Sequence, residues 1–190
     1  MSDKTANEKL CLVLSIRTTT ILLILASSST TAVLASGADG LTHIHLYLHE
    51  TFKGANATAI TTVASPLGAN ASFGSIGVLD DELRVGRDRS SELVGRFQAL
   101  LVGTGLEAGA TNFLTTISLV FTAGEYAGST LSVVGPVLGF SGAIERAVVG
   151  GTGKFRMARG YSLLKLLGNP TPETVLFELD LFVLLPSGKY

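Results

Sequence analysis

Residues 148–161, VVGGTGKFRMARGY, are the most informative stretch of this chain for its fold. Its crowded glycines fit either a phosphate-binding loop or a β-hairpin. A phosphate-binding loop needs Ser or Thr after its lysine, but Phe155 follows Lys154, and Val148 stands where the first glycine should be. No helix-forming run follows that could direct its N-terminus at a phosphate. The stretch therefore predicts a strand, a glycine-rich turn and a second strand over residues 155–166.

The chain after residue 40 consists of short β-rich runs separated by Gly, Asp, Ser and Pro, without sustained helical periodicity. Eight or nine short strands favour a closed barrel or a sandwich, and a barrel removes the exposed edges that invite aggregation. Two glycine-rich segments, 103–112 and 136–145, would be loops at the mouth of a barrel, where ligands enter. The expected strands are residues 42–50, 58–64, 73–80, 92–102, 113–122, 126–134, 146–149, 155–166 and 174–185.

The hairpin stretch resembles the best-preserved motif of the plant dirigent family, and further segments of that family's pattern recur in the same order. The resemblance spans residues 42–185. It implies an all-β fold, namely a single-domain, eight-stranded antiparallel β-barrel that assembles as a trimer. The other matching segments are Leu46 to Glu50, Phe73-Gly74, Val78 to Asp81, Leu93 to Gln98 and Gly124 to Leu131.

The N-terminus has the pattern of a secretory signal peptide over residues 1–36, which leaves 37–190 as the barrel domain. Basic residues precede a short apolar run, and small residues follow it. That run is too short to span a membrane, although an uncleaved anchor or a plastid transit peptide remains an alternative. We expect an extracellular, apoplastic protein. The lone cysteine, Cys11, would leave with the signal.

The mature chain carries 11 basic and 13 acidic residues, so it lacks the basic surface of a nucleic-acid-binding protein. Asn56-Ala57-Thr58 and Asn70-Ala71-Ser72 are N-glycosylation sequons near predicted turns, and we expect at least one of Asn56 and Asn70 to be glycosylated. The strands at 114–121 and 176–185 are apolar on both faces, which independently favours a homo-oligomer.

Histidines 43, 45 and 49 alternate with other residues, so they share one face of the first strand with Tyr47. Two histidines at i and i+2 can ligate a metal, but no further His or Cys completes a site. We therefore expect an outer face, solvated or in a subunit contact, and no metal.

The opposite face of the same strand is apolar and ends in Glu50, as expected of a barrel interior with one acid near its mouth. A desolvated carboxyl keeps its proton near neutral pH and can serve as a general acid; the alternative is a solvated strand end. Of Asp80 and Asp81, only one can face inward, and the resemblance favours Asp81. The pair also fits a turn after the strand. If buried, Arg96 would need Asp81 or Glu125 as its partner.

The resemblance thus suggests Glu50 and Asp81 as catalytic residues. Lignan-forming members carry pocket tyrosines where this chain has Leu100-Leu101-Val102-Gly103, and an Asp and an Arg where it has Val137 and Ile144, unless Arg146 substitutes. A cysteine pair of some members is missing too. The residues expected to contact substrate are Asp80, Arg96, Phe97, Glu125, Tyr126 and Phe155.

The favoured function is to hold phenolic radicals or quinone methides in an apolar cavity and to direct stereoselective coupling, as in lignan and phenylpropanoid metabolism. A separate oxidase or peroxidase would supply the radicals, because the chain has no redox-cofactor motif, and we expect no cofactor. One alternative is a lyase that expels water from an isoflavonoid-like phenolic, as in pterocarpan formation. Another is a non-catalytic defence or cell-wall binding protein.

Overall fold

The computed structural model describes residues 40–107 and 111–185, in which almost every regular element is a strand. The signal peptide predicted over residues 1–36, with Cys11, lies outside the described residues. The elements are β1 (Leu41–Thr51), β2 (Ala59–Val63), β3 (Ile76–Arg84), β4 (Leu93–Gly103), β5 (Asn112–Phe121), β6 (Thr130–Leu138), β7 (Ala143–Thr152), a 3₁₀ turn η1 (Gly153–Phe155), β8 (Arg159–Thr171) and β9 (Thr174–Leu184).

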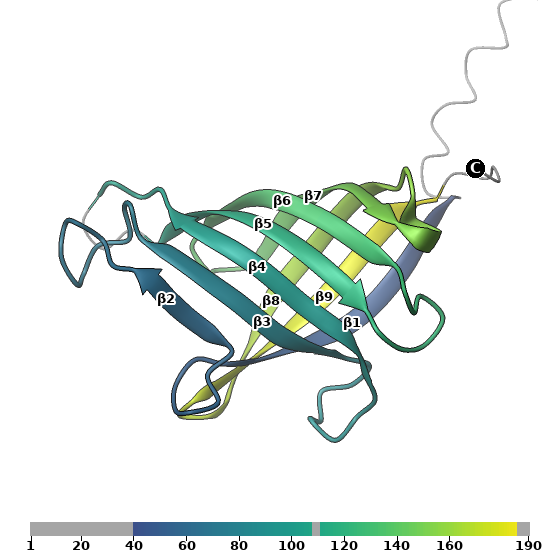
Figure 1. Cartoon of the computed structure of the whole chain (residues 1–190), viewed down its shortest axis with the longest axis horizontal. Coiled ribbons are helices and arrows are strands. Elements are labelled where there is room, and N and C mark those ends of the chain that lie inside the picture. The colour runs from purple at the N-terminus through teal and green to yellow at the C-terminus, as the bar shows by residue number, and fades with distance from the viewer. Residues whose placement is uncertain (1–39, 108–110, 186–190) are drawn as a thin grey trace, which may run out of the picture. The chain divides into compact units, whose positions relative to one another are not determined.

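The strands form an antiparallel barrel (Figure 1) in the order β1-β9-β8-β7-β6-β5-β4-β3, which closes because β1 also pairs with β3. The closing pairing is short and joins Tyr47 to Arg84, Leu48 to Leu83 and His49 to Glu82. The first half of β3 instead carries the short strand β2 on that edge. The predicted eight-stranded antiparallel barrel is confirmed, and β2 is a ninth strand beside the seam.

Thr58 separates β1 from β3 immediately beyond the closing pairs. Its backbone N–H donates to the carbonyl of Thr51 at 2.7 Å, and its carbonyl accepts from the N–H of Asp80 at 2.9 Å. The chain that leaves β1 therefore returns through the gap and continues as β2 along β3. This opening of the seam places Glu50, the last inward residue before the gap, beside the neighbouring strand's Asp81.

The hairpin predicted from residues 148–161 is present, but its second strand begins at Arg159 rather than Phe155. Residues 153–155 form the 3₁₀ turn, which directs the fully buried Phe155 ring into the core. Glycine is required here because a Cβ at Gly151 would lie 2.3 Å from the carbonyl oxygen of Thr130, and Gly153 has φ of +59°. The glycines therefore allow a tight turn against β6, with no space for a nucleotide cradle.

Two other expected boundaries were wrong. The Asp80-Asp81 pair does not end a strand, because β3 continues to Arg84 while pairing with β4. The expected loop at 136–145 is reduced to residues 139–142, since β6 runs to Leu138 and β7 begins at Ala143. In addition, β6 begins at Thr130 and residues 125–128 form a turn. These segments contain residues that favour turns, so the sequence suggested that the strands end there. Pairing with neighbouring strands instead continues through these residues.

The core follows strand alternation. Inward residues such as Leu48, Leu83, Leu119 and Leu181 are at most 1% exposed, whereas most of their strand neighbours are partly exposed. The outer face also carries exposed apolar side chains, including Leu100, Leu114 and Leu138 on β4 to β6. Association into a homotrimer through such a face stays a prediction.

Asn56 and Asn70 are both exposed in loops, so the sugar-transferring enzyme could reach either side chain, and their glycosylation also stays a prediction. Within residues 40–107 and 111–185, no helix is long and apolar enough to cross a bilayer.

Candidate functional site

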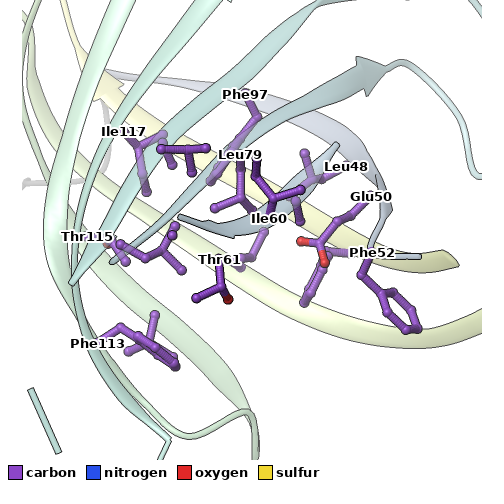
Figure 2. Close-up of a pocket in the computed structure, with 18 of the residues that line it drawn as sticks. Leu48, Glu50, Phe52, Ile60, Thr61, Leu79, Phe97, Phe113, Thr115 and Ile117 are labelled. Atoms are coloured by element: carbon purple, nitrogen blue, oxygen red, sulfur yellow. The ribbon is translucent and has the colours of Figure 1, made fainter. Parts of the chain in front are cut away.

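The barrel contains a cavity of about 770 Å³ on the side where β2 lies, which is large enough for a polycyclic small molecule. Most of its lining is apolar (Figure 2). Aromatic and aliphatic side chains from β1, β3, β4, β5, β6, β9 and the loops face the same space. They include Leu48, Phe52, Leu79, Phe97, Leu101, Phe113, Ile117, Val137, Phe140 and Phe177.

Glu50 lines this cavity, as its strand parity predicted. Figure 2 shows its carboxyl group beside Ile60 and close to Phe52. Burial raises the pKa of Glu50 from 4.5 to about 7, because the apolar surroundings disfavour the charged form. At neutral pH the Glu50 carboxyl is therefore able to donate a proton to a bound molecule.

Asp81 is inward and fully buried, directly behind the cavity wall, and it is not one of the lining residues. The Thr58 hydroxyl donates to its Oδ1, while its Oδ2 has no partner among the described residues. Burial raises the pKa of Asp81 to about 8; the Thr58 hydrogen bond opposes this rise, and the nearby Glu50 contributes to it. The pair thus consists of Glu50, which lines the cavity, and Asp81, which is buried behind it, and both carboxyl groups have raised pKa values.

Arg146 adds a cationic group to the same cavity. The side chain on β7 is 5% exposed, and its Nε has no partner among the described residues. Burial lowers the pKa of Arg146 to about 10, so the guanidinium still carries its charge at neutral pH. Gly135 on β6 makes space for it, since a Cβ there would lie 3.1 Å from Arg146 Cγ. Arg146 can donate to an oxygen of a bound molecule.

Asp80 and Arg96 lie on the outside of the barrel, so the structure does not bring these predicted substrate contacts to the cavity. Arg96 Nε donates to Asp80 Oδ1 at 2.9 Å, and a second guanidinium nitrogen donates to the Asp80 carbonyl. The expected pairing with Asp81 or Glu125 applied to a buried Arg96; the side chain is instead partly exposed and pairs with Asp80. Strand parity explains the difference, because Arg96 is paired with Glu82 in register and shares the outer face with Asp80.

The other predicted contacts divide between the two ends of the barrel. Phe97 lines the cavity. Phe155 and Tyr126 instead pack on Phe121, with ring centroids 5.3 and 5.6 Å from it, at the far end of β5 from the cavity residue Phe113. Glu125 belongs to the adjoining turn. These residues close one end of the barrel. The sequence motif alone did not show whether they close the barrel or contact a substrate.

Cavity residues outside the matched motifs were missed at the sequence level. Phe52 and Lys53 come from the loop after β1, and Phe140 comes from the short loop before β7. Val137 and Leu101 also line the cavity, at segments where the sequence departs from lignan-forming relatives. Alternation along β5, which places Phe113, Thr115 and Ile117 on one face, was the available signal for that wall.

The three histidines of β1 share its outer face, as predicted. His43 and His45 are exposed, while His49 is buried and its Nε2 lies 3.2 Å from the Gly86 carbonyl oxygen. The structure adds a partner that sequence spacing did not reveal, because Asp180 on β9 lies 2.7 Å from a ring nitrogen of both His43 and His45.

Comparison with known proteins agrees with this architecture. The family model described as "Dirigent-like protein" matches residues 41–184. Dirigent protein 1 of Arabidopsis thaliana is 42% identical over 126 residues, covering 65% of this chain and 68% of its own. Pterocarpan synthase 1 of Glycine max is 32% identical over 179 residues, covering 92% and 95%.

A solved structure of a pterocarpan synthase dirigent protein superimposes with a TM-score of 0.68 at 33% identity, covering 79% of this chain and 87% of that one. A second such structure also gives 0.68, at 34% identity with 80% and 99% covered. Sequence and barrel geometry together show that this chain belongs to the dirigent family.

Proposed function

We propose that this dirigent-family chain closes a ring on a hydroxylated phenolic by expelling water, with Glu50 as the proton donor. The observation that carries the proposal is a carboxyl with pKa raised to about 7, facing a cavity of about 770 Å³ whose wall is mostly apolar. Water-poor surroundings favour a neutral acid, and an acid is what the departure of a hydroxyl group requires.

The reaction balances without an oxidant. The Glu50 carboxyl protonates the substrate's benzylic hydroxyl, the C–O bond breaks, and water leaves. A phenol conjugated with that carbon supplies an electron pair to it and releases its own proton to water, which gives a neutral quinone methide. A second phenolic oxygen then forms the new C–O bond and passes its proton to the Glu50 carboxylate, while the quinone methide oxygen takes a proton back from water and becomes a phenol again. The net change is the loss of one water and the gain of one ring.

The other polar groups support this sequence of steps. Arg146 can donate to the oxygen of the quinone methide or phenolate as negative charge develops there. Asp81 acts as a positioning residue, because its negligible exposure keeps it from the substrate although Glu50 lies close enough to raise the pKa of Asp81. Phe97, Phe113 and Phe177 offer faces to aromatic rings and would hold them in a reactive orientation.

The similarity to proteins named pterocarpan synthases supports this assignment. Those of Glycine max and Glycyrrhiza echinata each align over 90% or more of this chain. The substrate class proposed here is accordingly an isoflavonoid-like phenolic bearing a hydroxyl at a position conjugated with a ring.

A second candidate is the orientation of phenolic radicals produced by a separate oxidase or peroxidase. The observation in its favour is the predominantly apolar cavity wall, including Leu101 and Val137, which can enclose aromatic rings. This function assigns no proton transfer to Glu50 in the coupling step itself.

Oxidant dependence separates the two functions. The purified full chain would be incubated with a hydroxylated isoflavonoid, such as an isoflavanol with a free phenol, and separately with coniferyl alcohol, each with and without laccase. Loss of water from the isoflavanol without laccase supports the lyase. Enantiomeric excess in coniferyl alcohol dimers, seen only with laccase and with no dehydration, would contradict it and support radical orientation.

A further inference from the structure

The outer surface of the barrel carries a second cluster of potential ligands, where β1 pairs with β9. His45 stands directly opposite Asp180 in the register, and His43 stands opposite Phe182. His43 Nε2 and His45 Nδ1 each lie 2.7 Å from Asp180 Oδ1. The three potential ligand atoms all lie within 4.8 Å of one another.

Neighbouring side chains orient both imidazoles. The His43 ring stacks on Phe182 with centroids 4.5 Å apart and planes at 4°, and Phe182 stacks in turn on Tyr161 at 4.8 Å. His45 Nε2 lies 3.0 Å from the Tyr47 hydroxyl and 3.6 Å from a Glu178 oxygen. An Nε2–H that donates to these oxygens leaves the Nδ1 lone pair directed at Asp180, which is the arrangement found behind metal-bound histidines.

His45 can adopt either tautomer here. In one, Nδ1–H donates to Asp180 and the Tyr47 hydroxyl donates to Nε2; in the other, Nε2–H donates to Tyr47 and the Nδ1 lone pair faces Asp180. In the second tautomer, a divalent cation between the three atoms can accept electron pairs from both nitrogens and from the oxygen. Zn²⁺ takes His nitrogens at about 2.0–2.1 Å and carboxylate oxygens at about 2.0–2.2 Å, so ligand atoms around it lie within about 4 Å of each other. Small side-chain rotations reach this spacing.

We propose that His43, His45 and Asp180 form a surface site for a first-row divalent transition metal such as Zn²⁺. Two imidazoles and one carboxylate suit this class of ion better than Ca²⁺ or Mg²⁺, which prefer oxygen ligands alone. The two histidines are 49% and 38% exposed, so solvent or a further ligand completes the coordination. The site is separate from the cavity and independent of the proposed lyase activity.

The charges around the cluster include two acids and two bases. Glu178 adds negative charge, while Arg87 lies 3.9 Å from Glu178 and above the Tyr47 ring. Lys165 stands opposite Glu178 on β8. Protons compete with the metal for the imidazole nitrogens, so affinity should fall as the solution is made more acidic.

Isothermal titration calorimetry with ZnCl₂ tests the site. The full chain would carry a tag without histidine and the substitution Cys11→Ser, which removes the one thiol. We expect saturable binding of one ion per chain at pH 7.5. His45→Gln and Asp180→Asn should each weaken binding by more than about 100-fold, because loss of a ligand exceeds the 10–100-fold effect of losing an outer-shell partner. Asp80→Asn, an exposed acid outside the cluster, is the matched control and should bind normally.

Circular dichroism would confirm that each variant is folded. Should one of them fail to fold, Tyr47→Phe supplies an independent measurement, with affinity reduced by about tenfold through loss of the His45 partner. Absence of saturable binding up to millimolar ZnCl₂ would overturn the proposal. Equal binding by His45→Gln, Asp180→Asn and the parent chain would overturn it as well.

Discussion

Asp80 and Asp81 are neighbours on β3, yet they occupy opposite chemical environments. Asp80 faces solvent, and its hydrogen bond from Arg96 holds the pKa of that carboxyl below its usual value. Asp81 faces the interior, and burial raises its pKa to about 8. Water and a paired cation stabilise the ionised form on one face, while the other face stabilises the protonated form. Strand alternation alone therefore decides which acids of this barrel can donate protons.

The same division holds for the remaining acids near these faces. On the outside, Glu82 is partly desolvated, but hydrogen bonds from Arg84 and Arg89 leave the pKa of Glu82 lowered. On the inside, Glu50 has a raised pKa with burial as its cause. The chemistry of the chain thus depends on acids that lack cationic partners.

The largest expected effect comes from the inner acid that lines the cavity. Glu50→Gln keeps the size and hydrogen bonding of the side chain but removes the transferable proton, so dehydration should slow by roughly 10²-fold or more. Steady-state kinetics with an isoflavanol would measure it. In the parent chain, the rate should also fall as pH rises through about 7, the pKa of Glu50. An unchanged rate in the folded variant would exclude Glu50 as the donor.

Replacement of the buried acid, Asp81, should change the stability of the fold rather than the rate of the reaction. The pKa of Asp81 is about 8 in the folded chain and 3.8 as a model value, so the folded state binds more protons between these pH values. Its contribution to stability is complete below about pH 4 and is lost as pH rises to about 8. Asp81→Asn has no ionisable group at this position, so the variant should not lose this stability as pH rises. At pH 8.5 we expect a Tm above that of the parent by on the order of 5 °C, since 1 kcal/mol corresponds to about 2–4 °C at this chain length.

Differential scanning calorimetry at pH 5 and pH 8.5 checks this expectation. The difference in Tm between Asp81→Asn and the parent should grow with pH. If the difference is constant or shrinks, Asp81 is ionised in the folded protein, and the contrast between the two faces of β3 fails at that residue.

Arg146 tests whether the cavity cation serves binding or structure. Arg146→Met preserves much of the side-chain volume and removes the charge. One lost charge-assisted hydrogen bond corresponds to about 1.5–3 kcal/mol, so KM should rise by about tenfold or more. Stability should be equal or higher, because the replaced guanidinium is buried without an ion pair. Lys165→Met, an outward cation on β8, is the control. A large loss of Tm with unchanged KM would show a structural role.

The smallest effect is expected on the outer face. Asp80→Asn breaks an exposed ion pair with Arg96, which is worth less than about 1 kcal/mol and is screened by salt. Because the pKa of Asp80 is lowered, the contribution is present near neutral pH and disappears as pH falls through that value. Urea unfolding at low and high salt measures it. A dehydration defect as large as that of Glu50→Gln would show that Asp80 reaches the substrate.

Much of the barrel could be predicted from local pattern. Alternation identified the inner face of β1 with Glu50 at its end, and the glycines of residues 148–161 identified a hairpin rather than a nucleotide loop. Segment ends were less predictable, as with β3 beyond Asp81 and β6 up to Leu138. Hydrogen bonding to adjacent strands carried these segments through residues that favour turns in isolation.

Local sequence pattern was enough to predict the fold class, the family and the parity that separates Asp80 from Asp81, because these depend on residues within single strands and turns. The partners of these side chains became clear only from the folded barrel. Arg96 pairs with Asp80 rather than Asp81, and Arg146 lines the cavity. Asp180 lies beside His43 and His45, which are 135 or more residues away in the sequence. Pairing register and barrel closure bring such residues together, and no local pattern specifies either one.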